Sequence, residues 1–291
     1  MFQATFTVTA ARRAEKTQLA ARAGWGYRGP MGAPAPTVTA IGGAQIVAAL
    51  RQLGVEPSDT LFVHSDLRCA LRIAGTSVEA KVDTLLDALV DAVVDGVLAM
   101  PTFSYSFCQG QDFDVDATPS TVGLLTERFR RRPGVRRTAD PLFSAALLGA
   151  IPDPWSDLFE PGDSDAFGER SVFAFLRARR AKLAFVGASF EYCTYVHHVE
   201  QRLGVPYRYF KEFSGKVGGR AVTARYFVRR LDQDVETSLA GLADELVARG
   251  DVRRAALPGM SLMVADVTAV DRAAVEAVAR NPDFLLARGR P

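Results

Sequence analysis

Four short apolar runs recur along this chain, and they restrict its possible folds more than any other feature. They are TLFVH at 60–64, GVLAMP at 96–101, LFSAALLG at 142–149 and KLAFVG at 182–187. Runs this short and this apolar are typical of strands that are buried on both faces of a sheet. Segments with helical periodicity separate them. The sequence therefore predicts an α/β fold with a mixed, mostly buried central sheet and helices on both faces.

Apolar residues three and four positions apart predict the helices. One helix begins near Gly43, and a long amphipathic one spans 77–94. Thr118 and Pro119 are an N-cap residue and a first-turn proline, so we expect a helix from there to about Arg131. The remaining expected elements are helices at 194–204 (stopped by Gly204), 236–250 and 271–281, and a polar-edged strand at 224–230.

Composition limits the function classes. The chain has 291 residues and a net charge of +2, so nothing global favours nucleic acid or an anionic membrane as a partner. Three widely spaced cysteines indicate reduced thiols rather than a disulfide framework. No secretory pattern or apolar stretch of membrane-spanning length is present, and we expect a cytoplasmic protein. Residues 1–40, rich in Gly, Pro and Ala, predict an arm or linker, and 41–291 a single domain.

Two polar loops follow predicted strands. His64, Ser65 and Asp66 end the first strand, and the PTFSYSF segment at 101–107 follows the second. Ligands of open α/β sheets bind beyond the carboxyl ends of the strands, so both loops are candidate binding segments. Each could equally be a local turn in which hydroxyls cap the backbone.

The segment TYVHHVEQR at 194–202 holds two of the three histidines. On a helix, His197 and Glu200 share one face, which puts a carboxylate beside an imidazole. That pair suits a general base with its orienting acid, and we expect Glu200 to raise the pKa of His197. His198 points about 100° away around the helix. A surface His–Glu pair is the plain alternative, and a metal site lacks a clear third ligand.

Two further patterns leave alternatives open. RFRRRPGVRR at 128–137 contains six arginines, which could bind nucleic acid or a phosphate, although a solvated helix end is favoured. Cys193 lies four residues before His197 and could be a nucleophile, with Thr194 as the expected helix cap.

Five segments in this order resemble the aminoglycoside 3-N-acetyltransferase family, which is unrelated to the GNAT fold. They are VHSDL at 63–67, AMPTFS at 99–104, FDVDATPSTVGLLTERFRRRPGVRRT at 113–138, DPLFSAALLG at 140–149 and TYVHHVEQR at 194–202. The resemblance covers about residues 43–285, and the long third segment is its most specific part. It implies an acyltransferase domain over 41–291, acetyl-CoA as acyl donor, no metal, and the amine of an amino sugar as acceptor.

The resemblance also implies roles for individual residues. His197 matches the family's catalytic histidine and Glu200 its glutamate. It implies CoA-binding positions at His64, Ser65, Leu67, Arg72, Thr102, Ser104, Thr118 and Ser120. It implies acceptor-binding positions at Asp66, Tyr105 and Asp140. A hydroxyl or N–H near Ser65 or Thr102 would stabilise the oxyanion.

This chain departs from the family pattern at Asp140 and at Cys193, directly before the last of these segments. Members usually have histidine at the position of Asp140 and asparagine at that of Cys193. Three functions therefore remain open beside aminoglycoside resistance: acylation of amino sugars in surface-polysaccharide or natural-product pathways, CoA binding without turnover, and a Cys193 hydrolase. A homodimer is also left open.

Overall fold

The computed structural model describes residues 40–232 and 236–287. All but the last residue of the predicted arm at 1–40 therefore lies outside the described residues. The described chain contains a seven-stranded sheet in the order β3-β4-β2-β1-β6-β10-β9. Its centre is parallel: β1 (Thr60–Ser65) lies between β2 (Val97–Pro101) and β6 (Lys182–Val186). The predicted strands at 60–64, 96–101 and 182–187 are thereby confirmed.

Antiparallel strands complete both edges of this sheet. β4 (Ala145–Gly149), within the predicted run at 142–149, pairs with β2 and carries the short β3 (Arg136–Arg137). On the other side β10 (Met260–Asp266) pairs with β6, and β9 (Val252–Leu257) forms the edge. The sheet is therefore mixed, as predicted, although the β9–β10 hairpin was not predicted from the sequence.

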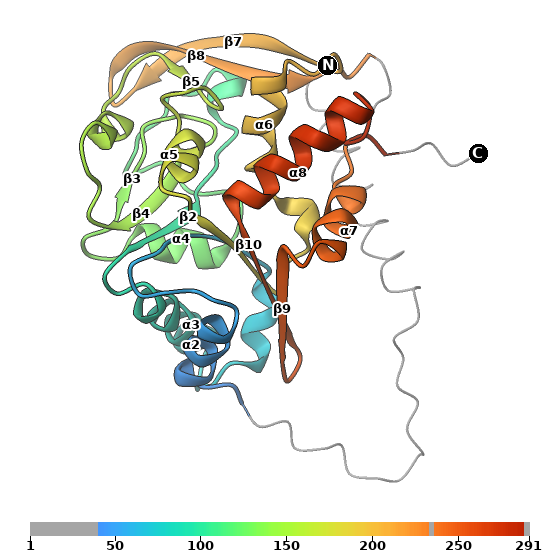
Figure 1. Ribbon diagram of the computed structural model, residues 1–291. Coiled ribbons are helices and arrows are strands. Elements are labelled where there is room, and N and C mark those ends of the chain that lie inside the picture. The colour runs from blue at the N-terminus through green and yellow to red at the C-terminus, as the bar shows by residue number, and fades with distance from the viewer. Residues whose placement is uncertain (1–39, 233–235, 288–291) are drawn as a thin grey trace, which may run out of the picture. The chain divides into compact units, whose positions relative to one another are not determined.

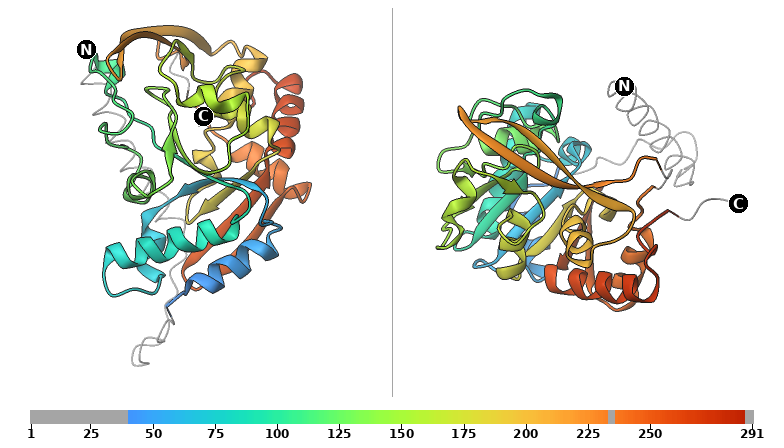
Figure 2. Two further views of the ribbon diagram at one scale, coloured as in Figure 1. Left: turned by 90° about the vertical axis from the view of Figure 1, so that its left-hand side faces the viewer. Right: turned by 90° about the horizontal axis from the view of Figure 1, so that it is seen from above.

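Helices cover both faces of the central sheet (Figure 1 and Figure 2). One face carries α2 (Gly43–Gln52), α3 (Val78–Ala92) and α4 (Leu124–Arg130), and the other carries α5 (Val172–Ala178), α6 (Val196–Leu203) and α8 (Val267–Arg280). α7 (Ala240–Ala248) packs against α8. Strand residues alternate between the two resulting cores. In β1, Leu61 and Val63 join the α2–α3 side, while Phe62 joins the α5–α8 side.

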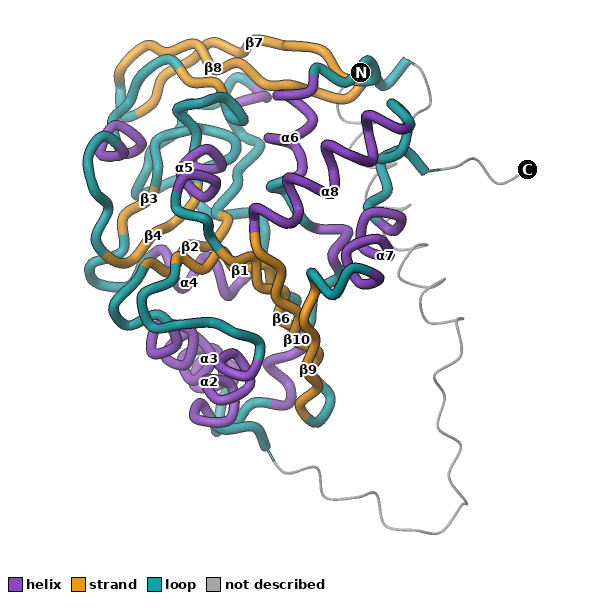
Figure 3. Tube along the Cα trace, viewed as in Figure 1, coloured by secondary structure: helices purple, strands orange, loops and turns teal. Residues whose placement is uncertain are grey.

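A second, three-stranded sheet in the order β5-β8-β7 lies over the α5 and α6 side (Figure 3). β7 (Arg208–Val217) and β8 (Arg220–Arg229) form a hairpin, and β5 (Ser164–Asp165) pairs with β8. Gly218 and Gly219 form the hairpin turn with φ of 55° and 82°, a backbone region that favours glycine. The predicted strand at 224–230 corresponds to part of β8.

The predicted helix at 118–131 begins later than expected. Thr118 accepts a hydrogen bond from the backbone N–H of Asp114, 2.9 Å from its Oγ1, so its hydroxyl closes a turn and does not cap a helix. Gly123, with φ of 138°, is the N-cap of α4. The expected cap Thr194 is also wrong, since Tyr195 occupies the N-cap of α6.

The other predicted helices are confirmed with shifted ends. The helix at 77–94 corresponds to α3, that at 194–204 to α6 with Gly204 in the left-handed region, that at 236–250 to α7 and that at 271–281 to α8. Short 3₁₀ helices span Leu67–Arg72, Phe107–Gln109, Trp155–Phe159 and Phe190–Tyr192. Within the described ranges, none of the helices has the length and apolar character needed to cross a bilayer.

Candidate active site

The carboxyl ends of the parallel strands bring three chain segments to one edge of the sheet. Ser65 ends β1, Thr102 follows β2, and the segment after β6 leads through Gly187 into α6. Gly187 has φ of 66°, and a Cβ there would lie 2.9 Å from the Cβ of Cys69. Glycine at this position therefore allows the segment after β1 to pack closely against the segment that carries His197.

The His197–Glu200 pair forms as predicted. His197 Nδ1 lies 2.7 Å from Glu200 Oε2, one turn along α6. Glu200 is almost completely buried, whereas 28% of the His197 side chain is exposed. The Phe167 ring packs edge-on against the imidazole, with centroids 5.4 Å apart. The carboxylate is thus inside the protein, and the imidazole stands at the surface of the site.

Two residues that the sequence analysis did not select complete the surroundings of Glu200. The Tyr207 hydroxyl donates to Glu200 Oε1 at 2.9 Å. Arg208, the first residue of β7, forms an ion pair in which its Nε lies 2.9 Å from Glu200 Oε2. Its Nη2 also lies 3.0 Å from His197 Nδ1. Arg208 belongs to a strand that the sequence pattern did not predict, so no spacing in the sequence indicated this contact.

The expectation that Glu200 raises the pKa of His197 above its ordinary value is wrong for the site as a whole. Burial lowers the pKa of His197, and the positive charge of Arg208 lowers it further, which together outweigh the hydrogen bond and negative charge of Glu200. Burial also acts on Glu200, where it favours the neutral acid. The contacts with His197, Arg208 and Tyr207 outweigh it, so the pKa of Glu200 is lowered.

These charges determine the tautomer of His197. An ionised carboxylate can only accept hydrogen bonds, so the 2.7 Å contact with Glu200 requires a proton on Nδ1. Arg208 then acts on the ring as a nearby charge. In the neutral imidazole, Nε2 carries the lone pair, and no described residue hydrogen bonds to it. His197 therefore presents a nitrogen that can accept a proton on its partly exposed side.

The other two histidines are buried. His198 has no exposed surface, and its Nδ1 lies 2.7 Å from the carbonyl oxygen of Phe167. His64 is 5% exposed, stacks on Phe185 and meets the edge of Phe62. Burial lowers the pKa of His64 to about 3, so it is neutral at physiological pH. The predicted CoA contact of His64 remains a prediction.

In the loop after β1, some side chains are exposed to solvent and others are packed or paired. Ser65 is partly exposed, and no described residue bonds its hydroxyl. Asp66 caps the following 3₁₀ helix by accepting from Arg68 N at 2.9 Å, and it also pairs with the Arg68 guanidinium. Leu67 packs on the α2–α3 core, and Arg72 is exposed. Ser65 and Arg72 therefore have side chains that a ligand could reach.

The loop after β2 is more deeply buried than the sequence suggested. Thr102 and Ser104 have almost no exposed surface, and Tyr105 packs partly buried against the α5–α8 core. The Thr102 hydroxyl bonds to Ser144 at 3.3 Å, and that of Ser104 to Ser106 at 3.2 Å. The predicted contacts of Thr102 and Ser104 with CoA stay predictions.

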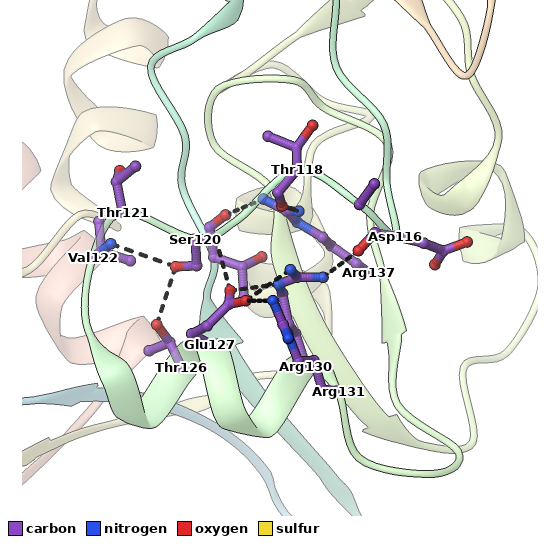
Figure 4. A network of polar contacts seen from close by, with 12 residues as sticks. Asp116, Thr118, Ser120, Thr121, Val122, Thr126, Glu127, Arg130, Arg131 and Arg137 are labelled. Atoms are coloured by element: carbon purple, nitrogen blue, oxygen red, sulfur yellow. Dashed lines mark hydrogen bonds and ion pairs between the residues drawn. The ribbon is translucent and has the colours of Figure 1, made fainter.

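Thr118 and Ser120 belong to a polar network around Arg130 and Arg137 (Figure 4). The carbonyl of Thr118 accepts from Arg137 Nη1 at 2.5 Å. The backbone N–H of Ser120 donates to Glu127 at 2.8 Å, and Glu127 in turn pairs with Arg130. Both residues thus hold the loop before α4 in place.

The arginine run divides into exposed and buried members. Arg128 and Arg131 lie at the surface, paired with Asp83 and Glu127, which confirms the favoured reading of a solvated helix end. That reading is wrong for Arg130 and Arg137, which are 8% and 5% exposed.

Asp140 lines a cleft of about 650 Å³ between the loop that follows β4 and the β5–β8 edge. Its carboxylate accepts from the backbone N–H groups of Leu142 and Phe143 and from the Ser164 hydroxyl, at 3.0, 2.6 and 2.8 Å. Burial raises its pKa. The cleft is lined by two arginines, Arg170 and Arg225, and by a larger number of carboxylates. These carboxylates are Asp140, Asp157, Glu160, Asp163, Asp165, Glu169 and Glu212.

The cysteines do not present an activated thiol. Cys193 is 1% exposed, and burial raises the pKa of its thiol to about 12. Burial likewise raises the pKa of Cys69 to about 12 and that of Cys108 to about 11. A thiol is a nucleophile only as thiolate, so the geometry disfavours a Cys193 hydrolase. No group of three or more His, Cys, Asp or Glu side chains in the described ranges could hold a metal ion.

The chain is similar to several known proteins. A family model described as aminoglycoside 3-N-acetyltransferase matches residues 62–278. Aminoglycoside N(3)-acetyltransferase IV of Salmonella sp is 28% identical over 166 residues, which are 56% of this chain and 60% of the relative. Aminoglycoside N(3)-acetyltransferase VIII of Streptomyces fradiae is 31% identical over 118 residues, which are 40% of this chain and 38% of the relative. The chain thus spans less than two thirds of both curated relatives.

Solved structures show the same fold at lower identity. The crystal structure of aminoglycoside acetyltransferase AAC(3)-Xa has a TM-score of 0.70 and 24% identity, with 84% of this chain and 94% of that chain covered. The binary complex of AAC-IIIb with CoASH has a TM-score of 0.69 and 20% identity, with 86% and 99% covered. The family match runs without interruption from β1 to α8 and takes in more than half of the sequence. This chain therefore belongs to the aminoglycoside 3-N-acetyltransferase family.

Proposed function

We propose that this protein is a CoA-dependent N-acetyltransferase that acetylates an amine of an amino sugar or aminoglycoside-like acceptor, with His197 as general base. The observation that carries the proposal is the His197 imidazole, held through Nδ1 by the buried Glu200 with Nε2 left without a bond partner among the described residues. The names of the relatives support N-acetyl transfer, and the CoASH complex of AAC-IIIb supports CoA as the carrier.

The chemistry requires no covalent enzyme intermediate. A neutral acceptor amine attacks the thioester carbonyl of acetyl-CoA, forming the C–N bond. Nε2 of His197 takes the proton that the nitrogen then carries in excess, and Glu200 stabilises the resulting imidazolium. The C–S bond breaks, and the proton passes to the departing CoA sulfur. The products are the N-acetylated amine and CoA thiol.

The carboxyl-end segments supply the other roles in this proposal. Ser65, with a free hydroxyl at the end of β1, is the better placed of the two predicted oxyanion donors, because the Thr102 hydroxyl and N–H already bond to Ser144. Ser65, Leu67 and Arg72 are proposed to contact CoA. The exposed arginine would suit its phosphates.

The acceptor is proposed to be cationic. Seven carboxylates line the cleft beside Asp140, and the chain segments that flank Phe167 form part of its wall. Phe167 itself contacts the His197 ring. An acidic cleft this close to the base would attract an amine-rich sugar. Acceptor contacts by Asp66, Tyr105 and Asp140 are part of this proposal.

The proposal extends to the rest of the chain. Residues 41–291 form the acyltransferase domain, and its location is cytoplasmic because acetyl-CoA is an intracellular metabolite. Neither nucleic acid nor a membrane is proposed as a partner.

The direct test is a screen for acetyl transfer. Acetyl-CoA is incubated with aminoglycosides, simple amino sugars and nucleotide-linked amino sugars, and CoA thiol release and N-acetyl products are measured. The proposal predicts stoichiometric thiol and product for at least one amine. Acetyl-CoA binding by calorimetry with no thiol release across the panel would instead identify a CoA-binding relative without turnover.

A further inference from the structure

The buried ion pair beside His197 has its cation in an unusual position. Arg208 lies at the start of β7, and α6 lies beneath the β7–β8 hairpin (Figure 1). Its side chain is 7% exposed, so the charge is held inside the protein. The guanidinium meets Glu200 at 2.9 Å and His197 Nδ1 at 3.0 Å, and it donates to the carbonyl of Phe227 at 3.3 Å.

Glu200 alone would give His197 two properties at once. The hydrogen bond fixes the Nδ1–H tautomer, which a base needs, but the negative charge also favours imidazolium, which cannot accept a proton. A permanent positive charge beside the same carboxylate separates these effects. It opposes the field of Glu200 at the ring, while the Nδ1 hydrogen bond remains.

We infer that Arg208 is a positioning residue that balances the charge of Glu200 so that His197 stays neutral, Nδ1-protonated and able to accept a proton at Nε2. The inference rests on the proposed role of His197 as base. Arg208 is assigned no contact with substrate, and it acts through the two residues of the pair.

Few described groups face the His197 imidazole, and two of them, Glu200 and Arg208, carry charge. From α6 the charged neighbour is Glu200, and from the start of β7 come Arg208 and, through Glu200, Tyr207. From the loop before α5 only the Phe167 ring touches His197. The direction of the His197 pKa, lowered first by burial and then by Arg208, agrees with the geometry.

The test is an NMR titration of His197 in isotope-labelled full-length protein, which needs no acceptor and no turnover. The chain has three histidines, and loss of one signal in His197→Asn assigns the resonance. In Arg208→Met the His197 midpoint should move to higher pH. Arg208→Lys, which restores a cation, should return it toward the wild-type value. The double variant Glu200→Gln, Arg208→Met should lie between the two single variants.

A matched control comes from the same hairpin. Arg229 is the cross-strand partner of Arg208 in the β7–β8 ladder and makes no contact with His197 or Glu200. Arg229→Met removes the same charge and should leave the midpoint within a few tenths of a pH unit, because a charge at the more exposed position is screened. A midpoint in Arg208→Met that stays in place or falls, in protein with a wild-type fold by NMR, overturns the inference.

Kinetics separate this inference from the proposed function. On a verified acceptor, the acid limb of kcat/KM should move to higher pH in Arg208→Met by the same amount as the NMR midpoint. A shifted midpoint without turnover on any amine would leave the charge balance standing and refute the enzyme. Turnover on an amine with an unshifted acid limb and an unshifted NMR midpoint would support the enzyme and refute the charge balance by Arg208. Should Arg208→Met fail to fold, the neutral Arg208→Gln replaces it: its His197 midpoint should move to higher pH than that of Arg208→Lys, and a midpoint equal to or below that of Arg208→Lys overturns the inference.

Discussion

At the scale of single residues, the His197 imidazole receives opposite influences from two charged neighbours. Glu200 favours the protonated ring, while burial and Arg208 favour the neutral one, and the balance lies on the neutral side. The pH at which such a base becomes active depends on this balance, because only the neutral imidazole accepts a proton.

Glu200→Gln tests the acidic partner. Removing the anion takes away the one influence that raises the pKa of His197, so the acid limb of kcat/KM should move to lower pH. The rate on the plateau should fall, because an amide orients and stabilises imidazolium less well. The limb that belongs to the acceptor amine should not move. A pH–rate profile identical to wild type in both position and height would show that His197 and Glu200 do not act as a pair.

Cys193→Ser tests the alternative nucleophile. The thiol is buried and held protonated, so the account predicts that turnover per folded molecule stays within about twofold of wild type. Burying a hydroxyl in its place should lower stability by about 1–3 kcal/mol. Thiol release and thermal unfolding measure the two effects separately. Abolished turnover in a fully folded variant would favour a covalent mechanism.

At the scale of elements, β3 fixes the loops that precede α4. Arg137 donates through Nη1 to the carbonyls of Val115 and Thr118, and through Nη2 to that of Thr102, which lies just beyond β2. Its Nε donates to the Ser144 hydroxyl at 3.0 Å. One buried guanidinium thus connects the loop after β2 with the loop before α4.

Arg137→Met should remove a charged donor from the carbonyls of Val115, Thr118 and Thr102, of which Thr102 keeps the Ser144 hydroxyl as a donor. The free energy of unfolding should fall by about 2–4 kcal/mol. The neighbouring Arg136 is the matched control. It is exposed, and its guanidinium lies 3.7 Å from the centre of the Phe159 ring. Arg136→Ala should cost about 1 kcal/mol or less. Urea unfolding gives both values, and equal losses for the two variants would contradict the assigned role of Arg137.

The sequence predicted the elements whose pattern repeats and missed those that depend on distant partners. The buried runs are short and continuously apolar and α3 repeats with the helical period, so their places were correct. β7 mixes aromatic, charged and small residues and most of it is partly exposed, so neither pattern identified it. Thr118 has the chemistry of a cap, but its hydroxyl closes a turn with Asp114, a competition that spacing alone cannot resolve.

The same distinction applies to the candidate site. His197 and Glu200 were predictable because three residues of helix separate them. Arg208 was not, because it reaches the pair through a strand that the sequence pattern did not show. For the same reason the pKa of His197 was expected to be raised, and the structure gives the opposite direction.

At the scale of the whole molecule, burial lowers the pKa of all three histidines, so the folded chain favours their neutral forms. In the unfolded chain they titrate near 6.5. The unfolded state therefore binds more protons at its histidines below that pH, and the histidine contribution to folding stability decreases as pH falls from about 7. His64, with its pKa near 3, makes the best-defined contribution.

His64→Gln should remove roughly 2 kcal/mol of the stability difference between pH 7 and pH 5, since glutamine does not titrate. The measurement is urea unfolding at both pH values for the variant and the wild type. The comparison uses the difference between the two pH values, so any loss of packing by the variant cancels. An unchanged difference would mean that His64 is not neutral in the folded protein.

The central claim is that Nε2 of His197 takes the proton during acetyl transfer, and one measurement tests it most directly. His197→Asn can still place an amide N–H toward Glu200 but has no basic nitrogen at the position of Nε2. On a verified acceptor at saturating acetyl-CoA, its kcat should fall by about 10²–10⁴-fold. If folded His197→Asn releases CoA thiol at the wild-type rate, His197 is not the base.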